Sequence, residues 1–395
     1  KHRYIYTLAL NKTLCSAAWY DLNIDFGAKT LSHCCKSKRE PFPEIVTEDF
    51  FNNSTHIQNL RKDLVSGVEN SACNFCWNSY KETNTAYRDF KNKWTDATQV
   101  NRNIDNIEIT LDNICDMACV YCDATSSSRI AQELGHKKVM NVPDPEHMET
   151  FIDWFEKVAI KQPFIPLSFL GGEISYSKNF YKFMELILEK TSIYNKNINF
   201  SVLTNGNATA KNQKKLLDLF DRLPSKWGIS LGISNEATGE VAEAVRYGLD
   251  WNRFQSNFKD YINHPRIVNV TLAPTPNIFT LKHMNTYFLW VIEQLRKTDT
   301  KLAIFGNWVN WPNELDPARL DSSYKAHVKE TLKIIKDNKD LFLDDGQYSH
   351  TYKWLEQLHN RIGTQEQNDI HLDNWISNIA AQKKDSNLLK LREYI

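Results

Sequence analysis

Hydrophobic and polar positions follow one clear pattern from about residue 106 onward. Short runs of apolar or β-branched residues alternate with segments of helical periodicity. Near-continuous apolar runs separated by helices are typical of a parallel sheet built from βα units. The pattern therefore predicts an α/β fold with six strands. We expect these strands at 107–111, 164–170, 198–203, 228–233, 267–272 and 301–308.

The segments between these runs have the 3.6-residue apolar period of amphipathic helices. Six βα units can form a partial barrel or a doubly wound sheet, and periodicity does not distinguish the two. After Trp311-Pro312 the strand signal fades, and the rest of the chain has a helical pattern. Helices are expected at 126–134, 147–159, 177–191, 210–222, 236–247, 252–261 and 281–296.

Residues 1–100 show no sustained period of either kind, apart from a helix expected near 56–68 and a hairpin around Gly27. We expect a small domain here that is ordered more by metal ligation than by a large core. The predicted organisation is an N-terminal domain at 1–100, a barrel at 101–312 and a helical C-terminal extension at 313–395.

Composition and charge narrow the classes of function. Of 395 residues, 42% are hydrophobic, which is enough for a full core. Lys plus Arg is 48 and Asp plus Glu is 48, so the net charge is zero, which argues against bulk binding to nucleic acid or an acidic membrane. The sequence contains no run of 18 apolar residues, so we expect no membrane span. Residues 1–10 have too short an apolar core for a secretory signal. We expect a cytoplasmic protein.

The eight cysteines are the most informative residues, because all of them lie in the first third of the chain. Clustered cysteines in a large chain more often bind metal than form a disulfide framework. Cys115, Cys119 and Cys122 form a C-x3-C-x2-C triplet directly after the first predicted barrel strand. Three thiolates on one loop can hold three irons of a 4Fe–4S cluster and leave the fourth iron open for chemistry. A zinc knuckle or buried structural cysteines are the alternatives.

This triplet resembles the signature of radical S-adenosylmethionine (radical SAM) enzymes, in which an aromatic residue, here Tyr121, precedes the last cysteine. Further segments resemble family motifs in the expected order at successive strand ends, over about residues 105–310. In that family, GGE contacts the methionine amino group of SAM, an arginine meets its carboxylate, and a backbone segment lies near the adenine. The resemblance thus implies a cofactor site formed by Tyr121, Gly171, Gly172, Glu173, Thr204, Asn205, Gly206, Ser234, Arg246 and Asn277.

The other five cysteines resemble the ligand pattern of twitch or SPASM auxiliary-cluster domains, although in the family such domains usually follow the barrel. The set comprises Cys15, the adjacent pair Cys34 and Cys35, and the C-x2-C pair Cys73 and Cys76. An auxiliary 4Fe–4S cluster and a structural zinc each need up to four ligands. We expect Cys15, Cys73, Cys76 and one of the adjacent pair to bind an auxiliary cluster. The spare thiol, Cys34 or Cys35, is either a buried structural residue or a hydrogen-atom donor or redox residue.

The resemblance implies an enzyme, of oxidoreductase or transferase type, that reductively cleaves SAM at a 4Fe–4S cluster. The resulting 5′-deoxyadenosyl radical abstracts hydrogen from the substrate, and the auxiliary cluster assists. A peptide or protein side chain is the leading substrate class, with a small sugar or nucleotide second. An electron donor such as flavodoxin or ferredoxin is implied as a partner. The alternative from another functional class is a tRNA-modifying or zinc-binding protein. The zero net charge of the chain weighs against this alternative.

Overall fold

The computed structural model describes residues 13–43, 47, 50–83, 86–94, 104, 106–162, 164–366 and 369–395. Its centre is a nine-stranded sheet with the order β3-β2-β1-β4-β5-β6-β7-β8-β9. Six strands, from β4 onward, follow one another in sequence order and pair in parallel, which is the order of a barrel and not of a doubly wound sheet. These strands are β4 (Asn106–Thr110), β5 (Phe164–Leu170), β6 (Asn197–Thr204), β7 (Gly228–Ile233), β8 (Ile267–Leu272) and β9 (Lys301–Ile304).

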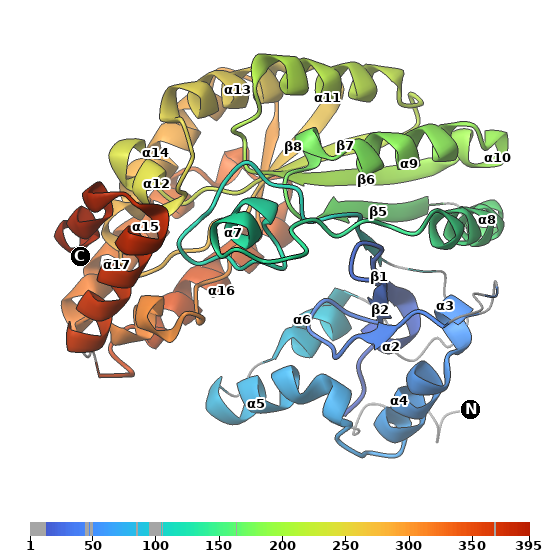
Figure 1. Cartoon of the computed structure of the whole chain (residues 1–395), viewed down its shortest axis with the longest axis horizontal. Helices are drawn as coiled ribbons and strands as arrows, with labels where there is room; N and C mark the ends of the chain where they lie inside the picture. The colour runs from blue at the N-terminus through green and yellow to red at the C-terminus, as the bar shows by residue number, and fades with distance from the viewer. Residues whose placement is uncertain are drawn as a thin grey trace.

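Helices connect the strands and pack on one side of the curved sheet (Figure 1). Three predicted strands have the bounds observed for β5, β7 and β8, whereas the last predicted strand ends four residues early, at Ile304. The helices between strands are α7 (Ser128–Glu133), α8 (Pro145–Lys161), α9 (Lys178–Leu188), α10 (Thr191–Tyr194), α11 (Ala210–Arg222), α12 (Gly239–Val245), α13 (Trp251–Asn263) and α14 (Met284–Leu295).

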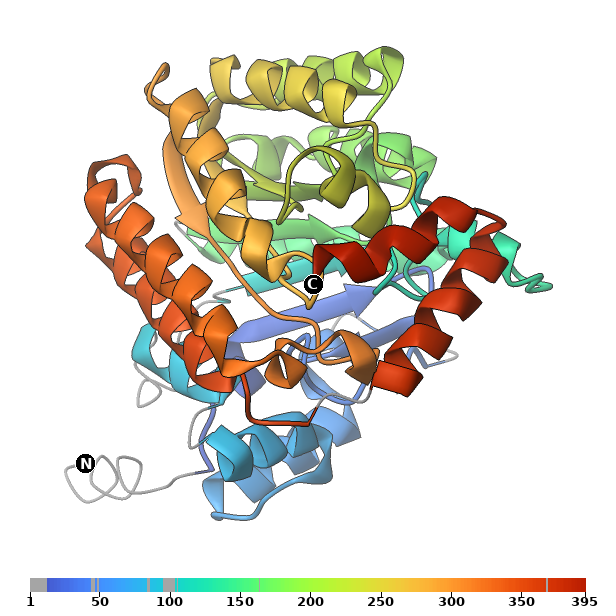
Figure 2. The same cartoon turned by 90° about the vertical axis from the view of Figure 1, so that its left-hand side faces the viewer.

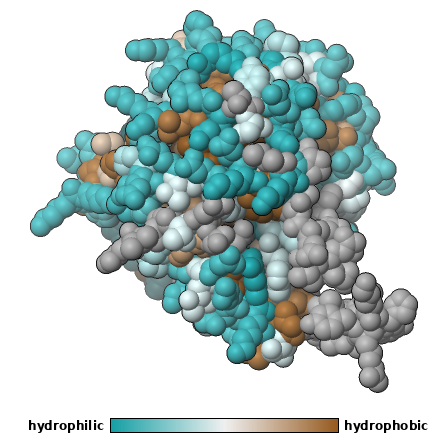
Figure 3. Space-filling view, turned by 90° about the vertical axis from the view of Figure 1, so that its right-hand side faces the viewer, coloured by the Kyte–Doolittle hydropathy of each residue, from teal (hydrophilic) through white to brown (hydrophobic). Residues whose placement is uncertain are grey.

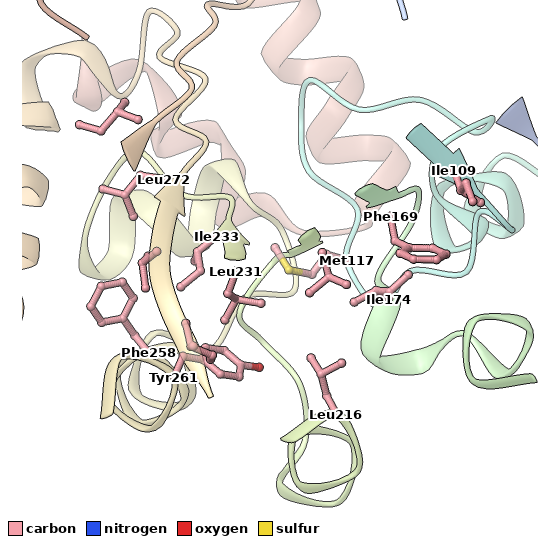
Figure 4. Packing of buried hydrophobic residues seen from close by; sticks show 14 of the residues in the cluster. Ile109, Met117, Phe169, Ile174, Leu216, Leu231, Ile233, Phe258, Tyr261 and Leu272 are labelled. Carbon is pink, nitrogen blue, oxygen red and sulfur yellow. The ribbon is translucent and has the colours of Figure 1, made fainter. Parts of the chain in front are cut away.

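The two faces of the sheet differ in chemistry. Side chains alternate across a strand, so Ile107 and Ile109 of β4 point to one face and Glu108 to the other. The apolar face is covered by helices: the ring of Phe169 in β5 lies 5.7 Å from that of Phe183 in α9. Figure 4 shows this layer of buried side chains between strands and helices. Burying each large side chain contributes about 1.5–3 kcal/mol, so this layer provides most of the driving force for folding.

The N-terminal region differs from the prediction, because it contributes three strands to the same sheet. These are β1 (Asp21–Asp25), β2 (Thr30–Ser32) and β3 (Glu40–Pro41); β1 and β2 form the expected hairpin, and β1 pairs in parallel with β4. A Cβ at Gly27, in the hairpin turn, would lie 2.9 Å from the carbonyl oxygen of Leu111. Glycine therefore allows the turn to approach the segment that leads into the cysteine triplet.

Short helices complete the N-terminal region, which lies beside one edge of the sheet (Figure 1). Ser54 caps the helix α4 through a hydrogen bond from the amide of Ile57. The helices of this region are α2 (Ala17–Tyr20), α3 (Phe50–Asn53), α4 (Thr55–Val65), the 3₁₀ turn η1 (Ser71–Cys73), α5 (Asn74–Thr83) and α6 (Tyr87–Trp94).

The C-terminal extension is helical and lies close to the opening of the barrel (Figure 2). Trp354 of α16 covers Gly306, where a Cβ would come within 2.1 Å of the indole ring. Lys383 of α17 pairs with Glu133 of α7 at 2.5 Å, so this extension also contacts the helix that follows the cysteine triplet. The 3₁₀ turn η3 (Leu281–His283) belongs to the barrel, where it precedes α14. The elements of the extension are η4 (Asn313–Leu315), η5 (Pro317–Arg319), η6 (Ser322–Tyr324), α15 (Lys325–Asp337), η7 (Lys339–Leu341), α16 (Asp345–Arg361), α17 (Asp369–Lys383) and η8 (Ser386–Tyr394).

The coloured part of the face shown in Figure 3 is mainly hydrophilic, with small separate apolar patches. Within the described ranges, none of the helices has the length and apolar character that crossing a bilayer requires. Residues 1–10, whose apolar core is too short for a secretory signal, lie outside the described residues.

Candidate functional site

The cysteine triplet lies on the loop between β4 and α7, at the carboxyl end of the first barrel strand. Cys115, Cys119 and Cys122 are all partly buried. Burial raises the pKa of each thiol, and Cys119 adds to the rise of the pKa at Cys115 and at Cys122. Because thiols with raised pKa values stay protonated near neutral pH, metal binding here must displace protons.

The backbone of this loop is held on both sides. The amides of Ala118 and Val120 donate to the carbonyl oxygens of Tyr247 (2.8 Å) and Val245 (2.9 Å), at the end of α12. The hydroxyl of Ser127, which caps α7, donates to the carbonyl oxygen of Met117 at 2.7 Å. The Met117 side chain lies in the apolar core near Ile174 (Figure 4). The loop therefore has a fixed shape before any ligand binds.

The GGE segment packs directly on this loop. The Glu173 amide donates to the carbonyl oxygen of Ile114 at 2.5 Å. A Cβ at Gly172 would lie 2.1 Å from the same oxygen, so only glycine permits this approach. Gly171 has a positive φ of 133°, which also favours glycine. The two glycines thus allow the segment after β5 to lie against the cysteine loop.

The Glu173 carboxylate is fully buried and surrounded by hydrogen-bond donors. Its Oε1 accepts bonds from the amide (3.1 Å) and hydroxyl (2.7 Å) of Ser175 and from the Thr204 hydroxyl (2.8 Å). Its Oε2 accepts a bond from the Asn205 amide at 2.6 Å. Burial raises the pKa of Glu173, while these donors oppose the rise because they favour the carboxylate. The structure thus joins the predicted residues Glu173, Thr204 and Asn205 in one network.

A second link joins the TNG segment, Thr204-Asn205-Gly206, to the cysteine loop through Asp116. The Asn205 side chain donates to Oδ1 of Asp116 at 2.8 Å, and that of Asn207 donates to Oδ2 at 2.9 Å. The Asn207 amide group also donates to the carbonyl oxygen of Gly248 at 3.0 Å. These bonds connect the carboxyl end of β6 both to the triplet and to the segment after α12.

Tyr121, Glu236 and Arg246 form a buried charged group beside the triplet. The Tyr121 hydroxyl donates to Oε1 of Glu236 at 2.7 Å, and Arg246 donates to Oε2 at 2.6 Å. Burial disfavours the charged form of Arg246, but the attraction of Glu236, together with smaller contributions from Tyr121 and Cys119, raises the pKa of the arginine overall. Arg246 in turn lowers the pKa of Cys119, although burial has the larger, opposite effect. The predicted cofactor arginine is therefore next to the triplet and already paired with a carboxylate.

The other two predicted cofactor residues lie at the ends of the next strands. Ser234 follows β7, is half-buried and donates its amide to the carbonyl oxygen of Thr204 at 2.9 Å. Asn277 follows β8 and is fully buried; its amide donates to the Thr280 hydroxyl and its Oδ1 accepts from the Phe279 amide, each at 3.0 Å. The amide of Ile278 donates to the carbonyl oxygen of Leu315. The backbone amides of Asn277 and Ile278 therefore both donate hydrogen bonds within the protein.

Three buried polar atoms along this edge of the sheet have no hydrogen-bond partner within the described part of the chain: Oδ1 of Asn235, Nε of Arg246 and Nδ2 of Asn277. Leaving such an atom unpaired in a buried position costs about 1–3 kcal/mol. Donors and acceptors of this kind fit a polar cofactor that carries carboxylate, amine and hydroxyl groups. The chemistry of the site thus suits SAM at the triplet.

The five N-terminal cysteines divide into two kinds. Cys15, Cys34, Cys73 and Cys76 are buried, whereas Cys35 is exposed. Cys15, Cys34 and Cys73 pack in one small core. Burial raises the pKa of Cys15 to about 12, and Cys76 and Cys73 make smaller contributions to the rise. We call Cys15, Cys34, Cys73 and Cys76 the N-terminal cysteine cluster. Among the residues described, no three His, Cys, Asp or Glu side chains are grouped closely enough around one point to hold a single metal ion.

The N-terminal cysteine cluster and the triplet lie at opposite ends of the sheet. Cys15 precedes β1 and Cys34 follows β2, which is antiparallel to β1. Both cysteines therefore lie at the amino end of β1. The triplet follows the carboxyl end of β4, which pairs in parallel with β1. The length of the five-residue strand β4 separates the two groups of cysteines along the strand direction, which is about 16 Å at 3.3 Å per residue.

A row of polar side chains crosses the inner face of the sheet, opposite the helix-covered face. Strand pairing aligns one residue from each of six parallel strands in this row. Such a surface can form hydrogen bonds with a polar molecule in the barrel. The residues are Asn23, Glu108, Ser168, Ser201, Ser230 and Asn269.

Sequence reasoning missed Glu236, Asp116 and Asn207. The sequence predicts a helix at 236–247 that includes Glu236, but that helix begins only at Gly239, because the Asn235 side chain donates to the carbonyl oxygen of Ala237 and forms a turn after β7. An acidic residue at the carboxyl end of a barrel strand was the available signal. Asp116 lies inside the triplet motif, and Asn207 directly follows TNG.

Comparison with known proteins links this site to a family. Residues 109–284, a little under half of the chain, match the model of the Radical SAM superfamily. This segment contains the triplet, GGE, TNG, Ser234, Arg246 and Asn277. No curated protein is significantly similar to the chain.

Solved structures with a similar arrangement are distant from this chain. Histidine-tagged anSMEcpe with bound AdoMet is 18% identical, with a TM-score of 0.39 and coverage of 58% of both chains. SuiB from Streptococcus suis is 12% identical, with a TM-score of 0.40, covering 71% of this chain and 51% of SuiB. TYW1 with a lysine-pyruvate adduct is 13% identical, with a TM-score of 0.33, covering 59% and 71%. The chain spans about half to three fifths of the length of the first two.

Proposed function

We propose that this chain is a radical SAM enzyme whose catalytic 4Fe–4S cluster is bound by Cys115, Cys119 and Cys122. The observation that carries the proposal is the position of Glu173: its amide bonds to the cysteine loop, and its carboxylate accepts bonds from Thr204 and Asn205. Motifs that follow three different strands therefore meet at one point. Active sites of parallel βα folds lie at this carboxyl edge.

The residues around the triplet have distinct roles in this proposal. Oε2 of Glu173 accepts one bond within the described protein, so it can accept another from the amino group of SAM. Arg246 is held by Glu236 and has an unpaired Nε, which would donate a hydrogen bond to the carboxylate of SAM. When bound, the cluster and SAM supply an organic radical that abstracts hydrogen from the substrate. The protein positions both groups and excludes water from them.

A peptide or protein side chain is the substrate we propose. The polar row on the inner face supports a substrate that can form hydrogen bonds, because Ser168, Ser201 and Ser230 present hydroxyl groups to the barrel interior. A low-potential electron donor of the flavodoxin or ferredoxin type would reduce the catalytic cluster.

The N-terminal cysteine cluster is the auxiliary 4Fe–4S site in this proposal. Its four buried thiols meet the requirement for four ligands, and the exposed thiol of Cys35 is the spare one. Because the site lies at the opposite edge of the sheet from the triplet, its proposed role is to exchange electrons with the barrel and not to bind SAM.

Iron content distinguishes the two sites. After anaerobic reconstitution, we expect about eight irons per chain in the wild type and in Cys35→Ala, and about four in Cys73→Ala. Metal analysis and a test for 5′-deoxyadenosine release from reduced protein with SAM provide the measurements. A wild-type protein with about four irons and one zinc would contradict the auxiliary cluster, and absence of 5′-deoxyadenosine would contradict the enzymatic function.

Replacing Glu173 should weaken SAM binding. Glu173→Gln removes the negative charge that would face the amino group of SAM and puts an amide beside donors of Ser175 and Thr204. Hydrogen bonds to charged groups contribute about 1.5–3 kcal/mol, so the Kd for SAM should rise roughly 10- to 150-fold. SAM-induced change in the cluster EPR signal provides the titration. Glu185→Gln, at an exposed glutamate paired with Arg222, should leave the Kd unchanged. Equal Kd values for both variants would exclude this role.

A further inference from the structure

The histidine beside the N-terminal cysteine cluster has a defined hydrogen-bond geometry. His33 is 2% exposed and lies immediately before Cys34. Its Nε2 is 3.8 Å from the Sγ atom of Cys73, within hydrogen-bond distance for sulfur. Its Nδ1 is 3.1 Å from the Ser37 hydroxyl. Both ring nitrogens are therefore engaged, one by a cysteine of the cluster and the other by a side chain four residues along the chain.

We propose that His33 is a positioning residue that donates its Nε2 hydrogen to the Cys73 thiolate and thereby raises the reduction potential of the auxiliary cluster. This inference rests on the proposed function, because it requires an iron–sulfur cluster at Cys15, Cys34, Cys73 and Cys76. Hydrogen bonds to cluster sulfurs are among the factors that set reduction potentials. The reduced cluster is one charge more negative, so a donor at its sulfur ligand stabilises the reduced state more than the oxidised state.

Ser37 allows the ring to adopt the required tautomer. Its hydroxyl lies near two acceptors, Nδ1 of His33 at 3.1 Å and the carbonyl oxygen of Lys38 at 3.3 Å. With a protonated Cys73 thiol, the thiol donates to Nε2, Nδ1 donates to Ser37, and the Ser37 hydroxyl turns to Lys38. With a metal-bound thiolate, Ser37 donates to Nδ1 and Nε2 keeps its hydrogen for the sulfur. One hydroxyl rotation thus accommodates both states of Cys73.

The chain segment around His33 makes further hydrogen bonds to the cysteines of the cluster or to residues next to them. The Lys36 amide donates to the Sγ atom of Cys34 at 3.3 Å, and the Ser32 hydroxyl donates to the carbonyl oxygen of Cys34 at 2.9 Å. The Lys38 amide bonds to the carbonyl oxygen of Ala72, next to Cys73, at 2.9 Å. The segment 32–38 therefore provides donors to two different cysteines and fixes His33 relative to both.

The test is a potentiometric titration of the reconstituted protein, followed by the EPR signal of the auxiliary cluster in a Cys119→Ala background that lacks the catalytic cluster. His33→Leu should bind wild-type iron and have a more negative midpoint potential. If the hydrogen bond favours the reduced state about tenfold, the shift is about 59 mV for a one-electron couple. His33→Gln, whose amide can occupy the position of Nε2, should restore most of the potential. Ser37→Ala should shift it in the same direction by less.

His136→Leu, at an exposed histidine outside this site, is the matched control and should not change the potential. If His33→Leu binds full iron with an unchanged midpoint potential, the proposal is wrong while the auxiliary cluster stands. If the wild-type N-terminal cysteine cluster binds zinc or no metal, both the auxiliary cluster and this inference are overturned, whereas SAM cleavage at the triplet is unaffected by that result.

Discussion

Cys119→Ala should reduce 5′-deoxyadenosine release from SAM to background. Cys119 is the central cysteine of the triplet, on the loop between β4 and α7. Loss of residues that only support metal ligands typically costs 10- to 100-fold in activity or affinity, so loss of a ligand should cost at least about 100-fold. Chromatography of anaerobic reactions with reductant and SAM measures the product, and iron analysis should give about four irons, from the auxiliary site.

The fold around Cys119 should survive this substitution. The loop is held by the backbone bonds from Ala118 and Val120 to the end of α12, and neither bond involves the Cys119 side chain. Cys35→Ala is the matched control, because it removes an exposed thiol outside both proposed clusters. It should retain about eight irons and full SAM cleavage. Undiminished cleavage in Cys119→Ala would show that the triplet is not the catalytic site.

The barrel strands were predictable because they are buried and parallel. Each run is mainly apolar and only a few polar residues interrupt it, as in β5, β7 and β8. The hairpin around Gly27 was predicted, but the pairing of its strand β1 with the barrel strand β4 was not. Asp21, Asn23 and Asp25 in β1 alternate with two apolar residues, because the polar side chains face the inner side of the sheet. This alternation lasts only five residues, which is too short to stand out beside the cysteines.

The candidate site was predictable as far as its motifs are continuous in the sequence. The triplet, GGE and TNG could be read from local spacing, and the structure brings all three together. The contacts that fix them are long-range: Tyr121 and Glu236 are 115 residues apart, and Asp116 and Asn207 are 91 apart. Hydrophobic periodicity contains no information about such pairs. Only the order of strands along the shared edge determines which polar residues meet.

The same argument explains why the two adjacent N-terminal cysteines could not be distinguished from the sequence. Cys34 and Cys35 have the same chemistry and neighbouring positions, and their difference arises from packing alone. Cys34 packs with Cys15 and Cys73 behind the β1–β2 hairpin, whereas Cys35 is exposed. Burial of Cys34 in the same small core as Cys15 and Cys73 is what favours it as the fourth ligand.

Glu236→Gln should produce the largest loss of stability among the single substitutions considered. The side chains of Glu236 and Arg246 are 1% and 6% exposed, and the carboxylate also accepts the Tyr121 hydroxyl bond. Removing one member of a buried ion pair leaves an uncompensated charge, at a cost of about 3–5 kcal/mol. The midpoint of urea unfolding, measured anaerobically, should fall accordingly, and SAM affinity should fall because Arg246 loses its fixed orientation.

Two further variants separate the charge effect from a general loss of packing. Glu293→Gln removes an exposed glutamate of α14 that pairs with Lys297, just beyond the end of this helix, and it should cost less than about 0.5 kcal/mol. Combining Glu236→Gln with Arg246→Met removes both buried charges, so it should recover part of the lost stability without recovering SAM binding. Recovery of stability without recovery of SAM binding would establish that Glu236 acts by holding a charged Arg246 beside the cysteine triplet. A double variant less stable than Glu236→Gln, or a single variant as stable as the wild type, would contradict that role.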